Sequence, residues 1–147
     1  MVASLTPTGG AGPGLTGASI VLVEDDDDIR ETMADLLSLE GHHIRTGRNG
    51  VEGLQALDDS LPQLVVTDLD MPVLDGRAMV LRMFVENLGR ENIPVVVISA
   101  APDLAGVAAA IGTPYYVGKP FSLDKLNSTI ERALAEGIPP RPPALLG

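Results

Sequence analysis

The sequence predicts an α/β domain of the (βα)5 type, with a doubly wound parallel five-stranded sheet. Two observations carry this prediction. Short, continuous apolar runs rich in β-branched residues alternate along the chain with segments whose apolar residues recur every three to four positions. Continuous apolar runs are typical of strands buried on both faces, and strands that alternate with helices form parallel sheets. Right-handed crossovers then place helices on both faces of the sheet.

Three strands are predicted from the strongest apolar runs, at residues 20–23, 64–67 and 95–98, which read IVLV, LVVT and VVVI. Two shorter runs, 43–46 and 115–117, predict weaker strands. Together they give the five strands of the sheet.

Five helical segments separate or follow these strands. Four are recognised by apolar stripes, which are Ile29, Met33, Leu36 and Leu37; Val51, Leu54 and Leu57; Met79, Met83 and Phe84 with Leu88; and Leu123, Leu126, Ile130 and Leu134. Gly41 and Gly89 are the predicted ends of the first and third helices. The remaining segment, 102–111, contains one charged residue and a central Gly106, and it predicts a short, marginal helix with an apolar exposed face.

Composition limits the classes of partner. The chain has 20 acidic and 10 basic residues, a net charge of -10, and no cysteine. Such a charge argues against duplex DNA or an anionic membrane as the main partner, because both require a basic surface. The lack of cysteine excludes a disulfide scaffold, and the N-terminus lacks the pattern of a secretory signal. A soluble, cytoplasmic domain is expected.

The chain divides into a body and two tails. Residues 1–18 hold no charged side chain and are rich in glycine, and residues 137–147 hold four prolines and one charge. Neither stretch shows helical or strand periodicity, so both are predicted to be flexible or extended tails. The domain itself is predicted at residues 19–136.

Polar residues follow four of the predicted strands. Glu24 and Asp25 follow the first, Asp68 and Asp70 the third, Ser99 the fourth and Lys119 the fifth. Ligands of doubly wound sheets bind at the carboxyl ends of the strands, so these side chains are expected to meet there. Carboxylates favour Mg²⁺, and a lysine with a hydroxyl favours phosphoryl oxygens.

Not every acid of this region is assigned to the site. Asp26, Asp27 and Asp28 are interpreted as caps or solvated loop, with Asp27 or Asp28 as the N-cap of the first helix, since Asp28 and Glu31 have capping-box spacing. His42 and His43 are interpreted as surface residues in the turn before the second strand.

These residues resemble a known family, the receiver domain of two-component response regulators, of which the chemotaxis regulator is a member. The resemblance covers residues 19–136 and rests on four motifs, which are VEDD at 23–26, TDLDMPVLDG at 67–76, VISA at 97–100 and VGKPF at 117–121. It implies the flavodoxin-like strand order 2-1-3-4-5.

The resemblance also implies a role for each matching residue. Asp68 matches the phosphoacceptor, a carboxylate that forms an acyl phosphate. Asp25 matches the direct Mg²⁺ (or Mn²⁺) ligand, and Glu24 an acid that acts through water. Asp70 matches the position whose backbone carbonyl binds the metal.

Three further positions match the residues that respond to phosphorylation. Ser99 matches the hydroxyl that hydrogen-bonds the phosphoryl group, and Lys119 the lysine that pairs with it. Lys119-Pro120 is expected to be a cis peptide bond. Tyr116 matches the aromatic switch residue, which turns inward on activation.

The function implied is signalling by phosphoryl transfer from a sensor histidine kinase or a histidine phosphotransfer protein to Asp68. The domain would catalyse only its own phosphorylation and dephosphorylation, and would act on a downstream protein as a monomer or a phosphorylation-dependent dimer. In the family the fourth helix, fifth strand and fifth helix form the output face. The apolar 102–111 segment either makes that face bind by apolar contact, or abolishes the usual dimer, or is simply a trimmed helix.

Two alternatives remain open. A phosphatase of the haloacid dehalogenase class also uses Asp-x-Asp after an apolar strand, as at Asp68-Leu69-Asp70. That class places its acid pair last, however, whereas here Glu24 and Asp25 come first. A pseudo-receiver that binds partners without phosphorylation is the second alternative, and the complete set of motif residues counts against it.

Overall fold

A computed structural model describes residues 17–86 and 88–143 of the chain. Its centre is a parallel sheet whose strands lie in the order β3-β2-β4-β5-β6. The strands are β2 (Ser19–Val23), β3 (His43–Gly47), β4 (Leu64–Asp68), β5 (Val95–Ser99) and β6 (Tyr115–Gly118). Numbered along the chain, this order is 2-1-3-4-5, which confirms the predicted fold, including both weaker strands.

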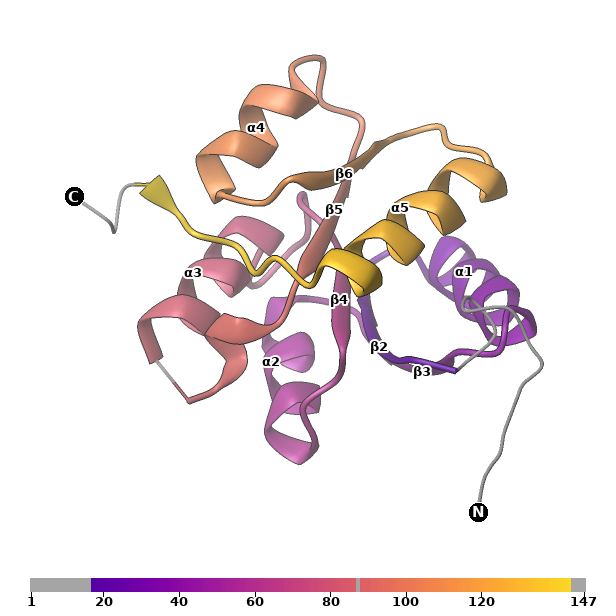
Figure 1. Cartoon of the computed structure of the whole chain (residues 1–147), viewed down its shortest axis with the longest axis horizontal. Coiled ribbons are helices and arrows are strands. Elements are labelled where there is room, and N and C mark those ends of the chain that lie inside the picture. Colours follow the sequence, from indigo (N-terminus) through magenta and orange to yellow (C-terminus); the bar gives the residue numbers. More distant parts are fainter. Residues whose placement is uncertain (1–16, 87, 144–147) are drawn as a thin grey trace.

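Helices connect the strands within the described residues. They are α1 (Asp27–Leu39), α2 (Gly50–Asp59), α3 (Gly76–Glu86), α4 (Leu104–Ile111) and α5 (Leu123–Glu136), with a short 3-10 helix η3 (Arg90–Asn92) before β5. The helices α1 and α5 cover one face of the sheet, and α2, α3 and α4 cover the other (Figure 1).

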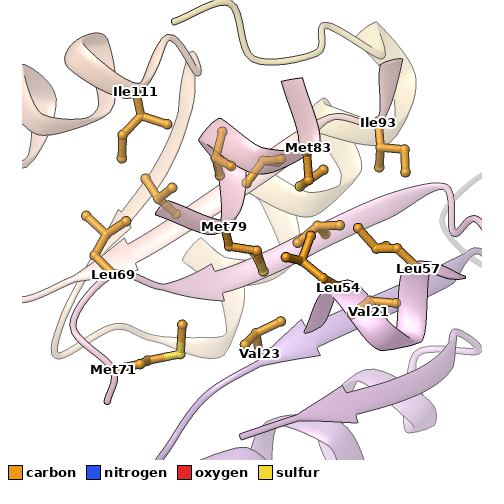
Figure 2. Packing of buried hydrophobic residues seen from close by; sticks show 14 of the residues in the cluster. Val21, Val23, Leu54, Leu57, Leu69, Met71, Met79, Met83, Ile93 and Ile111 are labelled. Atoms are coloured by element: carbon orange, nitrogen blue, oxygen red, sulfur yellow. The ribbon is translucent and has the colours of Figure 1, made fainter. Parts of the chain in front are cut away.

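The core has two layers because alternate residues of each strand point to opposite faces. Val21 and Val23 of β2 pack toward α2 and α3, where Leu54 and Met79 meet them (Figure 2). Ile20 and Leu22 of the same strand face α1 and α5. Both faces of the central strands are therefore buried, which explains why their sequences read as unbroken apolar runs.

The structure corrects three local predictions. The N-cap of α1 is Asp26, whose side chain accepts the N–H of Ile29 at 2.9 Å, rather than Asp27 or Asp28. The helix starts earlier because the carboxylate of Glu24 accepts the N–H of Asp26 and turns the chain directly after the strand. Leu88 lies beyond α3 and is exposed.

The third correction concerns His42, which is buried rather than on the surface, whereas His43 is exposed. The Nδ1 atom of His42 accepts the N–H of Ala18 at 3.2 Å. The imidazole thus binds the chain segment that enters β2. Burial lowers the pKa of His42 below its ordinary value.

The described part of the C-terminal tail, residues 137–143, runs from the end of α5 toward α4 (Figure 1). Residues 137–142 belong to no helix or strand, and Pro140 and Pro142 are buried. The expected N-terminal tail lies almost wholly in residues 1–16, outside the described residues. Among the described helices, none is both long and apolar enough to cross a bilayer.

Candidate functional site

The carboxyl edge of the sheet gathers the residues that the sequence places after four strands. Asp68 ends β4 and Ser99 ends β5. Glu24 follows β2 directly, and Lys119 follows β6. Parallel strands in adjacent register bring these ends together, as the sequence predicted.

Three carboxylates form the centre of the site. Glu24, Asp25 and Asp68 each place an oxygen within 4.8 Å of the others. Glu24 and Asp68 are buried, and Asp25 is exposed at the rim. Oxygen ligands at such spacing suit a hard divalent cation, and the mutual repulsion of the carboxylates would be relieved by one.

Lys119 supplies the positive charge of the site. Its Nζ atom donates to Oδ2 of Asp68 at 2.8 Å and to Oε1 of Glu24 at 3.2 Å. Burial of the ammonium favours its neutral form, but the hydrogen bonds and charges of Asp68 and Glu24 outweigh this effect and raise the pKa of Lys119 above its ordinary value. The lysine therefore stays protonated between the two acids.

Backbone groups fix the two buried carboxylates. Oδ1 of Asp68 accepts the N–H of Leu69 at 2.7 Å, and Oε2 of Glu24 accepts the N–H of Asp26 at 3.1 Å. Burial raises the pKa of Glu24, and the charge of Asp68 raises it too, although the hydrogen bonds from Asp26 and Lys119 act in the opposite direction. These hydrogen bonds thus hold the buried carboxylates in place although burial costs them hydration.

Arg30 is a residue of this region that sequence reasoning missed. Its guanidinium donates to the backbone carbonyl of Glu24 at 3.0 Å and pairs with Asp27 at 2.5 Å. The signal was available, because a long cationic side chain in the first turn of α1 can reach back to the strand that precedes it. Arg30 braces the turn that presents Glu24.

The other predicted residues lie around this centre. The Oγ atom of buried Ser99 accepts the N–H of Ala101 at 3.0 Å. The side chain of Asp70 is exposed, is not part of the carboxylate cluster and lies 3.9 Å from Arg77. Tyr116 projects from β6 and is 39% exposed, so its ring faces solvent. The Lys119-Pro120 peptide bond is cis, as expected.

The loop from Asp68 to Gly76 is tightly built. Gly76 donates its N–H to the carbonyl of Leu69 at 3.0 Å, and Asp75 caps α3 by accepting the N–H of Ala78 at 2.8 Å. Val73, at the tip, is exposed and has a φ of 70°, a left-handed conformation that β-branched residues rarely adopt. Nothing in the sequence pattern indicated this conformation.

These groups fit the binding of a divalent cation and a phosphoryl group. Glu24 and Asp25 with Asp68 offer oxygen ligands, which Mg²⁺ prefers over nitrogen or sulfur. Asp68 also offers a carboxylate nucleophile, and Lys119 a compact charge beside it. Chemically, Asp68 could take up a phosphoryl group. The negative charge of that group would be offset by Lys119 and by a cation held by the carboxylates.

Comparison with known proteins supports this chemistry. Residues 20–131 match the family model described as the response regulator receiver domain. The transcriptional regulatory protein PrrA of Mycobacterium tuberculosis is 30% identical over 123 residues, which are 82% of this chain and 52% of that protein. The transcriptional regulatory protein AfsQ1 of Streptomyces coelicolor is 31% identical over 81% of this chain and 52% of its own length. The chain thus spans about half the length of these relatives.

Solved structures show the same fold. NtrX from Brucella abortus superposes with a TM-score of 0.74 and 34% identity, over 83% of this chain and 28% of that one. The receiver domain of a signal transduction histidine kinase from Syntrophus aciditrophicus gives a TM-score of 0.72 and 27% identity, over 82% and 92% of the two chains.

Proposed function

The chain belongs to the response regulator receiver domain family, and on that premise we propose that Asp68 is its phosphoacceptor. The observation that carries the proposal is the meeting of three strand ends. Lys119, 51 residues after Asp68 in the chain, donates to that carboxylate and to Glu24 at once. A buried acid held between a lysine and further carboxylates suits phosphoryl transfer better than a structural role.

The proposed donor is the phosphohistidine of a sensor histidine kinase or of a histidine phosphotransfer protein. A carboxylate oxygen of Asp68 attacks the phosphorus, and a P–O bond forms as the P–N bond breaks. The electron pair of the P–N bond leaves on the ring nitrogen as neutral imidazole, provided that the other ring nitrogen carries its proton. The product is an acyl phosphate on Asp68.

A metal site made by Asp25, Asp68, Glu24 (through water) and the Asp70 backbone carbonyl is part of the proposal. Mg²⁺ or Mn²⁺ bound there supplies charge that offsets the phosphoryl oxygens. The exposed side chain of Asp70 is consistent with a role for its carbonyl alone. Receiver domains in general bind Mg²⁺, and the acidic cluster has suitable ligands.

Ser99, Lys119 and Tyr116 are the proposed response elements. Lys119 would exchange its contact with the Asp68 carboxylate for the phosphoryl oxygens, and the hydroxyl of Ser99 would donate to them. Because β5 and β6 pair along their length up to Ser99 and Gly118, movement of either strand end reaches Tyr116. The outward ring of Tyr116 would then turn inward.

The output partner is proposed to be a protein that binds the α4, β6 and α5 face, with the chain a monomer or a phosphorylation-dependent dimer. Although several relatives are named as transcriptional regulators, this acidic chain is not proposed to bind DNA or a membrane itself. A cytoplasmic location belongs to the same proposal and agrees with the cysteine-free composition. The role is signalling, with no reaction beyond its own phosphorylation and dephosphorylation.

The decisive experiment incubates the chain with acetyl phosphate and Mg²⁺ and measures intact mass. The wild-type chain should gain one phosphoryl group, and Asp68→Asn should gain none. Asp70→Asn is the matched control, because it alters a neighbouring acid but keeps the backbone carbonyl, and it should still be labelled.

An unlabelled wild type would instead support a pseudo-receiver. A label that persists on Asp68→Asn would show that the acceptor is another residue. Turnover of p-nitrophenyl phosphate over many cycles would favour the phosphatase alternative, for which the family match offers no support.

A further inference from the structure

The segment after α5 is bound to the body rather than trailing from it. Gly137 has a φ of 66° and ends α5 in the left-handed conformation, which redirects the chain. Residues 137–143, here called the C-terminal strap, then run to the side of the sheet that carries α4, and residues 137–142 belong to no helix or strand (Figure 1). Pro140 and Pro142 are buried along this path.

Every backbone donor of the strap has an acceptor. Four of its seven residues are prolines, so only Gly137, Ile138 and Arg141 carry an N–H. These three donate to the carbonyl of Ala133 at 2.8 Å, the hydroxyl of Tyr115 at 3.4 Å and the carbonyl of Gly112 at 2.9 Å. The proline spacing thus matches the acceptors that the body presents.

Gly112 is the docking point on α4. It lies at the C-terminal end of that helix with a φ of 90°, and the N–H groups of Gly112 and Thr113 bond back to Ala109 and Ala108 in a Schellman arrangement. The carbonyl of Arg141 occupies the space that a Cβ atom on Gly112 would fill. The strap therefore crosses the helix end in direct backbone contact.

Tyr115 is the docking point on β6. Its hydroxyl donates to Glu136 at 2.9 Å while it accepts the N–H of Ile138. Arg132 of α5 lies over its ring, 5.0 Å from the centroid, and donates to the carbonyl of Pro114 at 2.8 Å. These contacts join the end of α5, the strap and the first residue of β6.

The helix that the strap contacts is short and only partly buried, although Leu104 and Val107 also pack against the core and Asp103 caps its N-terminus. The eight residues of α4 carry no charge, and only Ala108 and Ile111 are buried. A helix of this length is marginal without tertiary contacts. Ordering the strap also costs little conformational entropy, because its prolines have few conformations to lose.

We propose that the C-terminal strap is a conformational restraint that fixes the α4–β6 turn to the end of α5 and confines movement of β6 to its Lys119 end. The statement about the movement of β6 rests on the proposed function. Gly112 and Tyr115, at one end of this region, are bound by the strap, whereas Ser99 and Lys119 lie at the opposite end of β5 and β6. Loss of the strap would free the turn to move as well.

Hydrogen exchange of the full chain, measured by mass spectrometry, tests the restraint. Arg141→Pro removes the N–H that bonds Gly112 and keeps the other strap residues, and Arg141→Ala is the matched control because it keeps the N–H. The first variant should accelerate exchange in residues 107–116 by roughly fivefold, the value of one hydrogen bond, and the control should not. A chain that stops at Gly137 should show the larger effect.

Two results would overturn the restraint. The first is unchanged exchange of residues 107–116 in both the Arg141→Pro variant and the shortened chain. The second is an acceleration in α1 and β2 as large as that in residues 107–116, which would indicate a loss of general stability only. The statement about the movement of β6 is tested by adding beryllofluoride as the phosphoryl analogue. Protection should change at residues 116–119 but not at 112–115 in the wild type, and at both in the shortened chain. If beryllofluoride alters no exchange around Asp68, the proposed function fails. The exchange rates of the wild type and the variants without beryllofluoride would still test the restraint.

Discussion

The carbonyl oxygen of Asp68 lies in the space that a Cβ atom on Gly76 would need. The last residue of β4 and the first residue of α3 therefore touch backbone to backbone, and the loop between them closes on itself. Because Asp68 is the proposed phosphoacceptor, this contact fixes the position of the backbone that carries the phosphorylated side chain.

Gly76→Ala should destabilise the fold by roughly 1–3 kcal/mol, because neither backbone can move without disturbing β4 or α3. Urea denaturation would measure the loss. Gly118→Ala is the control, since its Cβ would lie 3.7 Å from Leu104, an ordinary contact, and the change should stay within about 0.5 kcal/mol. Equal stability of the two variants would contradict the account of this loop.

Mg²⁺ should stabilise the wild-type chain, because it binds the folded acidic cluster and not the unfolded chain. The gain should approach about 2.7 kcal/mol when the ion is at 100 times its Kd. Asp25→Asn should lose most of this response, and Asp28→Asn, which is exposed and outside the cluster, should keep it. A full response of Asp25→Asn in thermal denaturation would show that the ion binds elsewhere.

Val73→Asn should stabilise the fold by about 1 kcal/mol, because asparagine tolerates a positive φ and valine does not. The side chain is exposed, so no packing is lost. Val85→Asn, at an exposed position of α3, should give no such gain. Urea midpoints of the three proteins would settle the matter, and a destabilised Val73→Asn would mean that the valine side chain has an unrecognised contact.

His42 predicts a pH dependence of stability. Its pKa in the fold lies below the ordinary value of 6.5, so the unfolded chain binds the proton more readily. The contribution of His42 is complete above pH 6.5 and is lost as the pH falls below that value. His42→Asn keeps an acceptor for the Ala18 N–H without titrating, so its free energy of unfolding should fall less between pH 7 and pH 5.

His43→Asn is the comparison variant, since His43 is exposed, and its charge is the smallest of the causes that act on the pKa of His42. Its effect on the pH dependence should therefore be much smaller than that of His42→Asn. If His42→Asn and the wild type lose stability in parallel over that range, the buried imidazole is not the group responsible.

The sequence predicted the sheet well because β2, β4 and β5 are buried on both faces and their polar residues stand only at the strand ends, so each apolar run is unbroken. The site centre was predictable for a related reason, since residues that follow parallel strands must share an edge. Local and long-range hydrogen bonds were the difficult part. The shift of the N-cap to Asp26 depends on the Glu24 carboxylate, and the burial of His42 depends on Ala18.

The C-terminal tail shows the same limit. Its lack of periodicity predicted a flexible or extended tail, which does not identify a binding site. The contact between Arg141 and Gly112 joins residues 29 positions apart in the sequence, and no periodicity in either segment indicates it. Only the three-dimensional match between donors and acceptors reveals the strap.

The pairing of Lys119 with Glu24 and Asp68 has a consequence for ion valence. The three carboxylates of the cluster and this one ammonium leave two negative charges. One divalent cation makes the group electrically neutral, whereas a monovalent ion leaves it anionic and a trivalent ion leaves it cationic. Lys119 is thus a counterion that belongs to the protein itself, and its single charge determines which charge of a bound metal ion makes the site neutral.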